Sequence, residues 1–162
     1  MDSQKSIKGT KTEKNLIIAY MAESAAYTRY TYYATQAEKE QYYPIQQIFL
    51  DTAANEFRHS KVFFKFLEGG SMPVSMNVDA GVISTTADNL ACAAHEEEVE
   101  GVELYTASAK VADEEGFPDI ASHFRAIAEI EAQHRRRFLH YLEQVKNGTV
   151  WKRDHEFTWK CL

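Results

Sequence analysis

The amino-acid sequence predicts an all-α fold, a four-helix bundle in which two antiparallel helix hairpins are joined by a long crossover. Composition is the first reason, because the 162 residues contain only three prolines and seven glycines and are rich in Ala, Glu, Lys, Leu and Gln. The second reason is that four segments repeat apolar residues at helical spacing. The third is the pattern of links, since two are very short and the middle one is long.

The four predicted helices cover approximately residues 12–40, 44–68, 86–115 and 118–147. Thr10 and Glu13 have the spacing of a capping box at the start of the first helix. Pro44 suits the first turn of the second helix, and Gly69 and Gly70 suit its end. The links QYY and GF are so short that each flanking pair of helices should run antiparallel.

The middle link, GGSMPVSMNVDAGVIST, has no helical period. When extended, a link of this length reaches roughly 55 Å, whereas a helix of roughly 25 residues is only about 37 Å long. The link can therefore begin the third helix at the far end of the bundle. We expect residues 1–147 to form the bundle and residues 148–162 to form a C-terminal tail of alternating, β-like pattern outside it.

The two hairpins also resemble each other. A shift of 75 residues aligns several pairs, namely Glu56 with Glu131, His59 with His134, Phe49 with Phe124 and Tyr30 with Tyr105. The same shift would place Glu23 on Glu98, although the apolar seam of the third helix selects Glu97. One extra residue between Glu97 and Tyr105 would repair this slip, so we predict a π-bulge there.

Each predicted helix carries an apolar seam that polar residues interrupt near its middle. The interrupting residues are Glu23 in the first helix, Glu56 and His59 in the second, Glu97 and Glu100 in the third, and Glu131 and His134 in the fourth. A single Glu-x-x-His on a helix is usually structural. Five glutamates and two histidines at one height are different, because each unpaired buried charge would cost several kcal/mol.

Positive charge must therefore balance these carboxylates. Arg29 and Arg58 lie off the seams, which leaves metal ions as the simplest source. Carboxylate oxygens with two imidazoles suit iron or manganese, and two Glu-x-x-His pairs plus glutamates from the other helices form the ligand pattern of di-iron carboxylate bundles. Five carboxylates against two ferrous ions leave one negative charge, and against two ferric ions one positive charge. This balance suits redox chemistry.

The same periodicity makes further predictions about burial. It places Tyr27 on the first seam and continues the third seam through Leu104, Ala107 and Val111. It leaves Glu96 and Glu98 on a solvated face of the third helix.

The segments ESAAYTRY, NEFRH, EEVEGVELY and EAQH, with the helix end KVFFKFLEGG, resemble the di-iron domain of rubrerythrins over residues 10–147. The resemblance implies a ferritin-like fold, two non-haem iron ions and the reduction of hydrogen peroxide to water. It implies seven metal ligands, namely Glu23, Glu56, His59, Glu97, Glu100, Glu131 and His134. It further implies that one iron exchanges Glu100 for His59 between oxidation states. Tyr30 and Tyr105 match family tyrosines that bind ligand carboxylates, although aromatic packing would explain them equally well.

Rubrerythrins usually carry a C-terminal rubredoxin domain, whose iron needs four thiolates. This chain has two cysteines, and Cys161 resembles the first cysteine of such a domain. Cys92 reads as a small packing residue. We therefore expect no complete rubredoxin iron site in this chain, whether by truncation or as a natural short form, and an external electron donor such as rubredoxin.

The remaining expectations concern partners and location. A net charge of −6 argues against nucleic acid, and no apolar run approaches the roughly 20 residues that span a bilayer. A cytoplasmic protein and a homodimer are expected. Three alternatives to a peroxidase are a ferroxidase or oxidase that uses dioxygen, a ferritin-like iron-binding shell, and a structural bundle with an adventitious zinc site. The absence of a short fifth helix argues against the shell.

Overall fold

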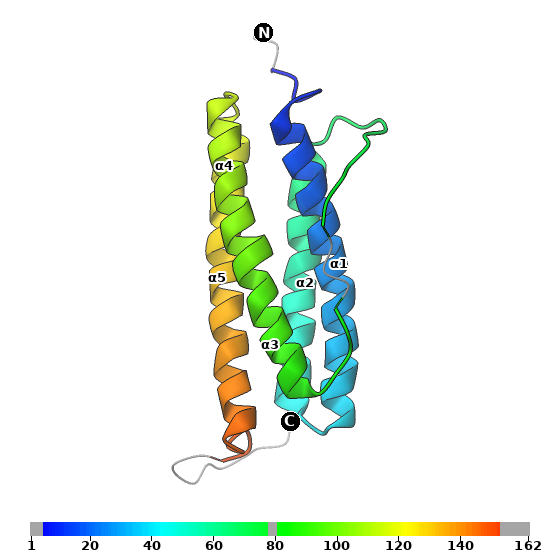
Figure 1. Ribbon diagram of the computed structural model, residues 1–162, viewed down its shortest axis with the longest axis vertical. Coiled ribbons are helices and arrows are strands. Elements are labelled where there is room, and N and C mark those ends of the chain that lie inside the picture. Colours follow the sequence, from blue (N-terminus) through cyan, green and yellow to red (C-terminus); the bar gives the residue numbers. More distant parts are fainter. Residues whose placement is uncertain (1–4, 78–80, 153–162) are drawn as a thin grey trace, which may run out of the picture.

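The computed structural model describes residues 5–77 and 81–152, and these residues form helices and loops without any strand. Figure 1 shows long helical rods lying side by side. The rods are α1 (Lys11–Lys39), α2 (Tyr43–Phe66), the consecutive series α3 (Thr86–Glu96), η1 (Glu97–Leu104) and α4 (Tyr105–Glu114), and α5 (Pro118–Lys146). The predicted four-helix bundle is confirmed, with helix ends within two residues of those expected.

Local chemistry explains where these helices begin. The side chain of Thr10 accepts a hydrogen bond from the backbone N–H of Glu13 at 3.0 Å. The Glu13 carboxylate accepts one from the N–H of Gly9 at 2.8 Å, which displaces the second half of the capping box by one residue. Pro44 and Pro118 occupy the first turns of α2 and α5, where proline costs no helical hydrogen bond.

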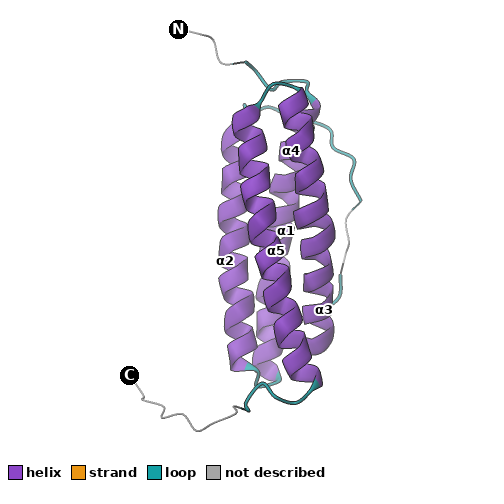
Figure 2. Cartoon of the chain, turned by 90° about the vertical axis from the view of Figure 1, so that its left-hand side faces the viewer, coloured by secondary structure: helices purple, strands orange, loops and turns teal. Residues whose placement is uncertain are grey.

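The helices pack as two hairpins. The first consists of α1 and α2, and in the second α5 packs against the series α3, η1 and α4. The described parts of the middle link run beside α1 along the bundle, from the end of α2 to the start of α3 (Figures 1 and 2). The long crossover is therefore confirmed. None of the described helices combines the length and the apolar composition needed to cross a bilayer.

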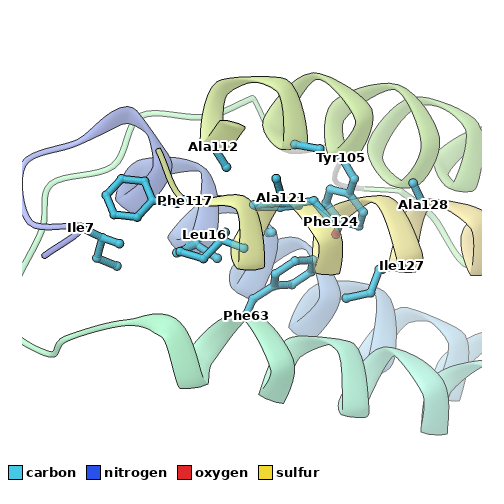
Figure 3. Packing of buried hydrophobic residues seen from close by; sticks show 13 residues of the cluster. Ile7, Leu16, Phe63, Tyr105, Ala112, Phe117, Ala121, Phe124, Ile127 and Ala128 are labelled. Carbon is cyan, nitrogen blue, oxygen red and sulfur yellow. The ribbon is translucent and has the colours of Figure 1, made fainter. Parts of the chain in front are cut away.

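Two apolar clusters fill the interior of the bundle. The first core cluster, drawn in Figure 3, includes Ile7, Leu16, Phe63, Tyr105, Phe117 and Phe124. The second core cluster includes Tyr30, Tyr33, Phe49, Leu90, Phe138 and Val150. Each fully buried phenylalanine contributes about 1.5–3 kcal/mol to folding. The helices carry the two clusters at different heights, and the polar interruptions of the four seams lie between them.

The tail begins against the bundle rather than away from it. Val150 is 3% exposed and belongs to the second core cluster. The rest of the predicted tail, including Cys161, lies outside the described residues.

Two burial predictions were wrong. Tyr27 is 41% exposed, and its ring packs instead against Phe57 on the outer side of α2, with ring centroids 5.7 Å apart. From the end of η1 onward, the third seam does not pass through Leu104, Ala107 and Val111, which are partly or fully exposed. It passes through Tyr105, Ser108 and Ala112, which are buried. The extra residue of a π-helical turn rotates every later side chain about the helix axis and causes this shift.

Candidate metal centre

The layer between the two core clusters is polar and almost completely buried. Six of the seven predicted ligands line it with exposed fractions of 1% to 7%, namely Glu23 on α1, Glu56 and His59 on α2, Glu97 on η1, and Glu131 and His134 on α5. Glu100 belongs to η1, but its side chain lies outside the described part of the structure.

These side chains form two overlapping groups, and within each group the ligand atoms lie within 4.8 Å of one another. The first group is Glu23, Glu56, His59 and Glu131, and the second is Glu56, Glu97, Glu131 and His134. Glu56 and Glu131 belong to both groups. Two groups that share two carboxylates are suited to a pair of adjacent metal ions.

The shared carboxylates divide their oxygens between the two histidines. Glu131 Oε1 lies 2.7 Å from Nδ1 of His59, and its Oε2 lies 2.6 Å from Nδ1 of His134. Glu56 does the same, with Oε2 3.1 Å from His59 Nδ1 and Oε1 3.1 Å from His134 Nδ1. The two imidazole rings face each other with centroids 6.0 Å apart. Each shared carboxylate therefore spans both groups.

The unshared carboxylates complete one group each. Glu23 Oε2 lies 3.7 Å from His59 Nδ1, and Glu97 Oε1 lies 3.8 Å from His134 Nδ1. Two buried tyrosines orient these carboxylates. Tyr105 donates a hydrogen bond to Glu23 Oε1 at 2.7 Å, and Tyr30 donates one to Glu97 Oε1 at 2.6 Å. Burial raises the pKa of both phenols well above the usual value, so both remain donors.

The electrostatics of the cluster show an excess of negative charge. Burial, reinforced by neighbouring carboxylates, raises the pKa values of Glu23 and Glu97 well above the ordinary value. Burial also opposes charging of His59, but Glu131, Glu23 and Glu56 outweigh it and raise the pKa of His59 to about 12. The pKa of Glu131 falls because His134 and His59 outweigh its burial. Protons therefore balance the charge wherever no other cation does.

Several of these candidate ligand atoms lack hydrogen bonds despite their close contacts. Glu56 Oε1, both Glu131 oxygens and His134 Nδ1 are buried without a hydrogen-bond partner in the described structure, because their contacts have ion-pair distances but not hydrogen-bond geometry. Buried polar atoms are rarely left in this state. Carboxylate oxygens and imidazole nitrogens that converge in this way fit iron ions.

The predicted π-bulge is confirmed, since η1 is π-helical from Glu97 to Leu104. Its extra residue lets Glu97 and Tyr105 both reach the polar layer, which a regular helix would not permit at this spacing. A glycine, Gly101, lies in the middle of η1 beside Glu131.

A third burial prediction, made for a residue beside the cluster, was also wrong. Glu96 is only 5% exposed rather than solvated, and it forms an ion pair with Arg29 of α1, whose side chain is 11% exposed. Glu98 forms a more exposed ion pair with Arg135 of α5. These two pairs attach the start of η1 to helices on either side. Sequence periodicity gives no signal for them, because they depend on how neighbouring helices are rotated.

The fold and this cluster together define a class: a ferritin-like helical bundle with a buried carboxylate–histidine site compatible with two iron ions. Comparison with known proteins identifies the family. The family model described as Rubrerythrin matches residues 14–87 and 88–160. The chain belongs to the rubrerythrin family.

Individual relatives agree with this assignment. A rubrerythrin from Porphyromonas gingivalis is 48% identical over 160 residues, covering 99% of this chain and 80% of the relative. A rubrerythrin from Nitratidesulfovibrio vulgaris is 41% identical, covering 97% of this chain and 82% of the relative. Among solved structures, fully reduced, all-ferrous nigerythrin superposes with a TM-score of 0.74 at 28% identity, covering 90% of this chain and 71% of that one. Symerythrin from Cyanophora paradoxa, at 20% identity and a TM-score of 0.69 over 89% of this chain and 90% of that one, supports the fold alone.

Proposed function

We propose that this protein is a non-haem di-iron peroxidase that reduces hydrogen peroxide to water in defence against oxidative stress. The observation that carries the proposal is the division of the Glu56 and Glu131 oxygens between His59 and His134. That arrangement supports two metal positions side by side, as a reaction that needs two electrons at one place requires. Membership of the rubrerythrin family supports the same conclusion.

The proposed ligands follow from the two groups. One iron would be held by Glu23, Glu56, His59 and Glu131, and the other by Glu56, Glu97, Glu131 and His134. Glu100 is proposed as the seventh ligand, exchanging with His59, on the strength of the family resemblance. When bound in the ferrous state, the pair supplies the two electrons that, with two protons, convert hydrogen peroxide into two water molecules.

The chain's own residues supply orientation and exclusion of solvent. Tyr30 and Tyr105 hold the unshared carboxylates by hydrogen bonds, and their raised pKa values keep these protons on the phenols. Burial of every described ligand keeps bulk water away, which strengthens the electrostatic interactions within the layer. In the metal-free protein, His59 carries its proton on the Nδ1 that faces the carboxylates, so an incoming ion must displace it.

The size of the space beside the ligands supports a small substrate. A cavity of about 20 Å³ is bordered by Glu23, Glu97 and Glu131, and its other walls include Ala22, Ala26 and Gly101. A cavity needs at least about 10–15 Å³ to hold one water molecule. This space suits hydrogen peroxide better than an organic peroxide with a bulky substituent.

Two proposals concern partners. On the strength of the family resemblance, we propose that an electron donor such as rubredoxin reduces the iron. We also propose a homodimer formed through the outer face of α1 and α2. Exposed apolar side chains recur there at heptad spacing, namely Leu50, Phe57 and Phe64, and Phe57 and Phe64 pack against Tyr27 and Tyr20. A cytoplasmic location remains a prediction of the sequence.

Stopped-flow spectroscopy on the anaerobic di-ferrous protein tests the peroxidase proposal. The iron should be oxidised much faster by hydrogen peroxide than by dioxygen at equal concentration. Glu131→Gln should abolish the fast phase, whereas Glu129→Gln, an exposed position on the same helix, should preserve it. Faster oxidation by dioxygen would overturn the proposal in favour of a ferroxidase or oxidase.

A further inference from the structure

The two histidines of the cluster differ in what their second ring nitrogen contacts. Nε2 of His134 lies 3.1 Å from the side-chain amide nitrogen of Asn55, which comes from the facing helix α2. Nδ1 of the same ring faces Glu131, Glu56 and Glu97. His134 therefore has polar neighbours at both nitrogens, with carboxylates on one side and an amide on the other.

Among the described residues, His59 has polar neighbours at one nitrogen only. Its Nδ1 makes all of its polar contacts, to Glu131, Glu56 and Glu23, and no hydrogen bond to its Nε2 exists within the described residues. The internal repeat explains the difference. The 75-residue shift that aligns Glu56 with Glu131 places Ile130 at the counterpart of Asn55, and a hydrocarbon side chain cannot hydrogen-bond a ring nitrogen.

We propose that Asn55 is a positioning residue that fixes the tautomer and the ring orientation of His134. The inference rests on the proposed function in one respect, namely that Nδ1 of His134 binds a metal ion. A neutral imidazole that offers the Nδ1 lone pair to a cation must carry its proton on Nε2. The Asn55 side chain can accept a hydrogen bond from that N–H through Oδ1, because a half-turn of the amide exchanges its oxygen and nitrogen.

The surroundings of Asn55 permit this half-turn. The one other side chain that hydrogen-bonds to its amide among the described residues is Arg58, whose Nη1 donates to Oδ1 at the long distance of 3.5 Å. A hydrogen bond of that length is weak. The amide oxygen is therefore available to His134, and the helical backbone of α2 fixes the position from which it reaches the ring.

Outer partners of this kind normally change metal affinity 10- to 100-fold, so we expect an effect of about that size here. The test compares Asn55→Leu, which keeps the size but removes the hydrogen bond, with Asn55→Asp, which keeps an acceptor. Gln133→Leu removes an exposed amide beside His134 and serves as the matched control. Circular dichroism of the metal-free variants checks that each one folds.

Two measurements decide the matter, and neither uses peroxide. The first is a titration with Co²⁺, in which Asn55→Leu should weaken one of two binding steps about 10- to 100-fold while Asn55→Asp and Gln133→Leu retain both. The second is a long-range ¹H–¹⁵N spectrum of the zinc-loaded protein. The Nε2 proton of His134 should be slow to exchange with solvent in the wild type and in Asn55→Asp, and fast in Asn55→Leu.

Wild-type affinity and slow exchange in Asn55→Leu would overturn the inference, as would fast exchange in a folded Asn55→Asp. The reciprocal variant Ile130→Asn gives His59 the missing amide and should slow exchange of the His59 Nε2 proton. Unchanged exchange there would also contradict the inference. Loss of peroxidase activity in the stopped-flow experiment would leave all of these readouts intact, so the two proposals can fail separately.

Discussion

Gly101 on η1 stands directly against Glu131 on α5. A Cβ atom added at Gly101 would lie 2.5 Å from the Cβ and 2.6 Å from the Cγ of Glu131, closer than real side chains approach. Glycine within a helix normally costs up to about 1 kcal/mol relative to alanine. Its presence here is explained by the close approach of the π-helical segment to the carboxylate that both metal groups share.

Gly101→Ala should therefore displace Glu131 despite its better helix propensity. We expect a net loss of about 1–3 kcal/mol in the free energy of unfolding, because overpacking outweighs the helical gain, together with weaker binding of both metal ions. Chemical denaturation with and without Co²⁺ measures the two effects. Ala107→Leu adds bulk at an exposed position nearby and should change neither the free energy of unfolding nor the binding of Co²⁺. Two tightly bound ions in Gly101→Ala would show that the close approach is dispensable.

The shared and unshared carboxylates should behave differently when neutralised. Glu131→Gln removes a ligand from both groups, so we expect loss of both ions. Glu23→Gln removes a ligand from the first group alone, so the second ion should remain bound. Metal content per chain after dialysis distinguishes the two variants. If the two variants lost the same amount of metal, Glu131 would not be a ligand shared by the two groups.

The tyrosine hydrogen bonds provide a milder perturbation of the same ligands. Tyr30→Phe leaves Glu97 without its 2.6 Å donor, and a hydrogen bond to a charged group contributes about 1.5–3 kcal/mol. We expect affinity for the ion held by Glu97 to fall, with little change at the first group. Tyr105→Phe should do the reverse through Glu23. Calorimetric titration with Co²⁺ resolves the binding of the two ions. Identical effects of both substitutions would count against the assignment of one tyrosine to each group.

The pH dependence of the metal-free protein follows from the proton-holding groups. The pKa of His59 rises from 6.5 to about 12 on folding, so its contribution to stability is complete below pH 6.5 and is lost as the pH rises toward 12. The pKa values of Glu23 and Glu97 are also raised on folding, so the stability that these two carboxyl groups contribute is likewise lost as the pH rises above 4.5. The pKa of Glu131 is lowered on folding, so this carboxylate contributes stability above pH 4.5 and loses that contribution as the pH falls below 4.5.

The free energy of unfolding of the metal-free protein should therefore fall between pH 6.5 and 9, by about 1.4 kcal/mol per pH unit for each proton released. Thermal unfolding followed by circular dichroism measures this trend. The metal-loaded protein should show the opposite trend, since the ions replace the protons and compete better at higher pH. Rising stability of the metal-free form over this range would contradict the electrostatic account.

The sequence predicted the buried glutamates and histidines that lie on regular helical seams, and it predicted the segment where the helical regularity breaks. Glu56 and His59 lie where simple periodicity places them, because α2 is an uninterrupted helix. The misalignment of Glu23 with Glu98 in the internal repeat was enough to locate η1. These features depend on local spacing alone, which a single sequence contains.

Features that depend on how helices are rotated against one another were not predictable. The ion pair of Arg29 with Glu96 and the contact of Asn55 with His134 each join residues far apart in the sequence. The third seam beyond η1 was mispredicted because the π-helical turn shifts the buried face by one residue, from Leu104 to Tyr105. The predicted seam kept regular helical spacing after the π-bulge, although the bulge rotates all later side chains about the helix axis.

The central claim is that two iron ions occupy the polar layer and share Glu56 and Glu131. Anomalous scattering at the iron edge, recorded from crystals of the iron-loaded protein, tests it most directly. We predict two iron peaks between His59 and His134, separated by roughly 3.5–4 Å, with both shared carboxylates contacting each peak. A single peak, or two peaks that do not share these carboxylates, would contradict the account.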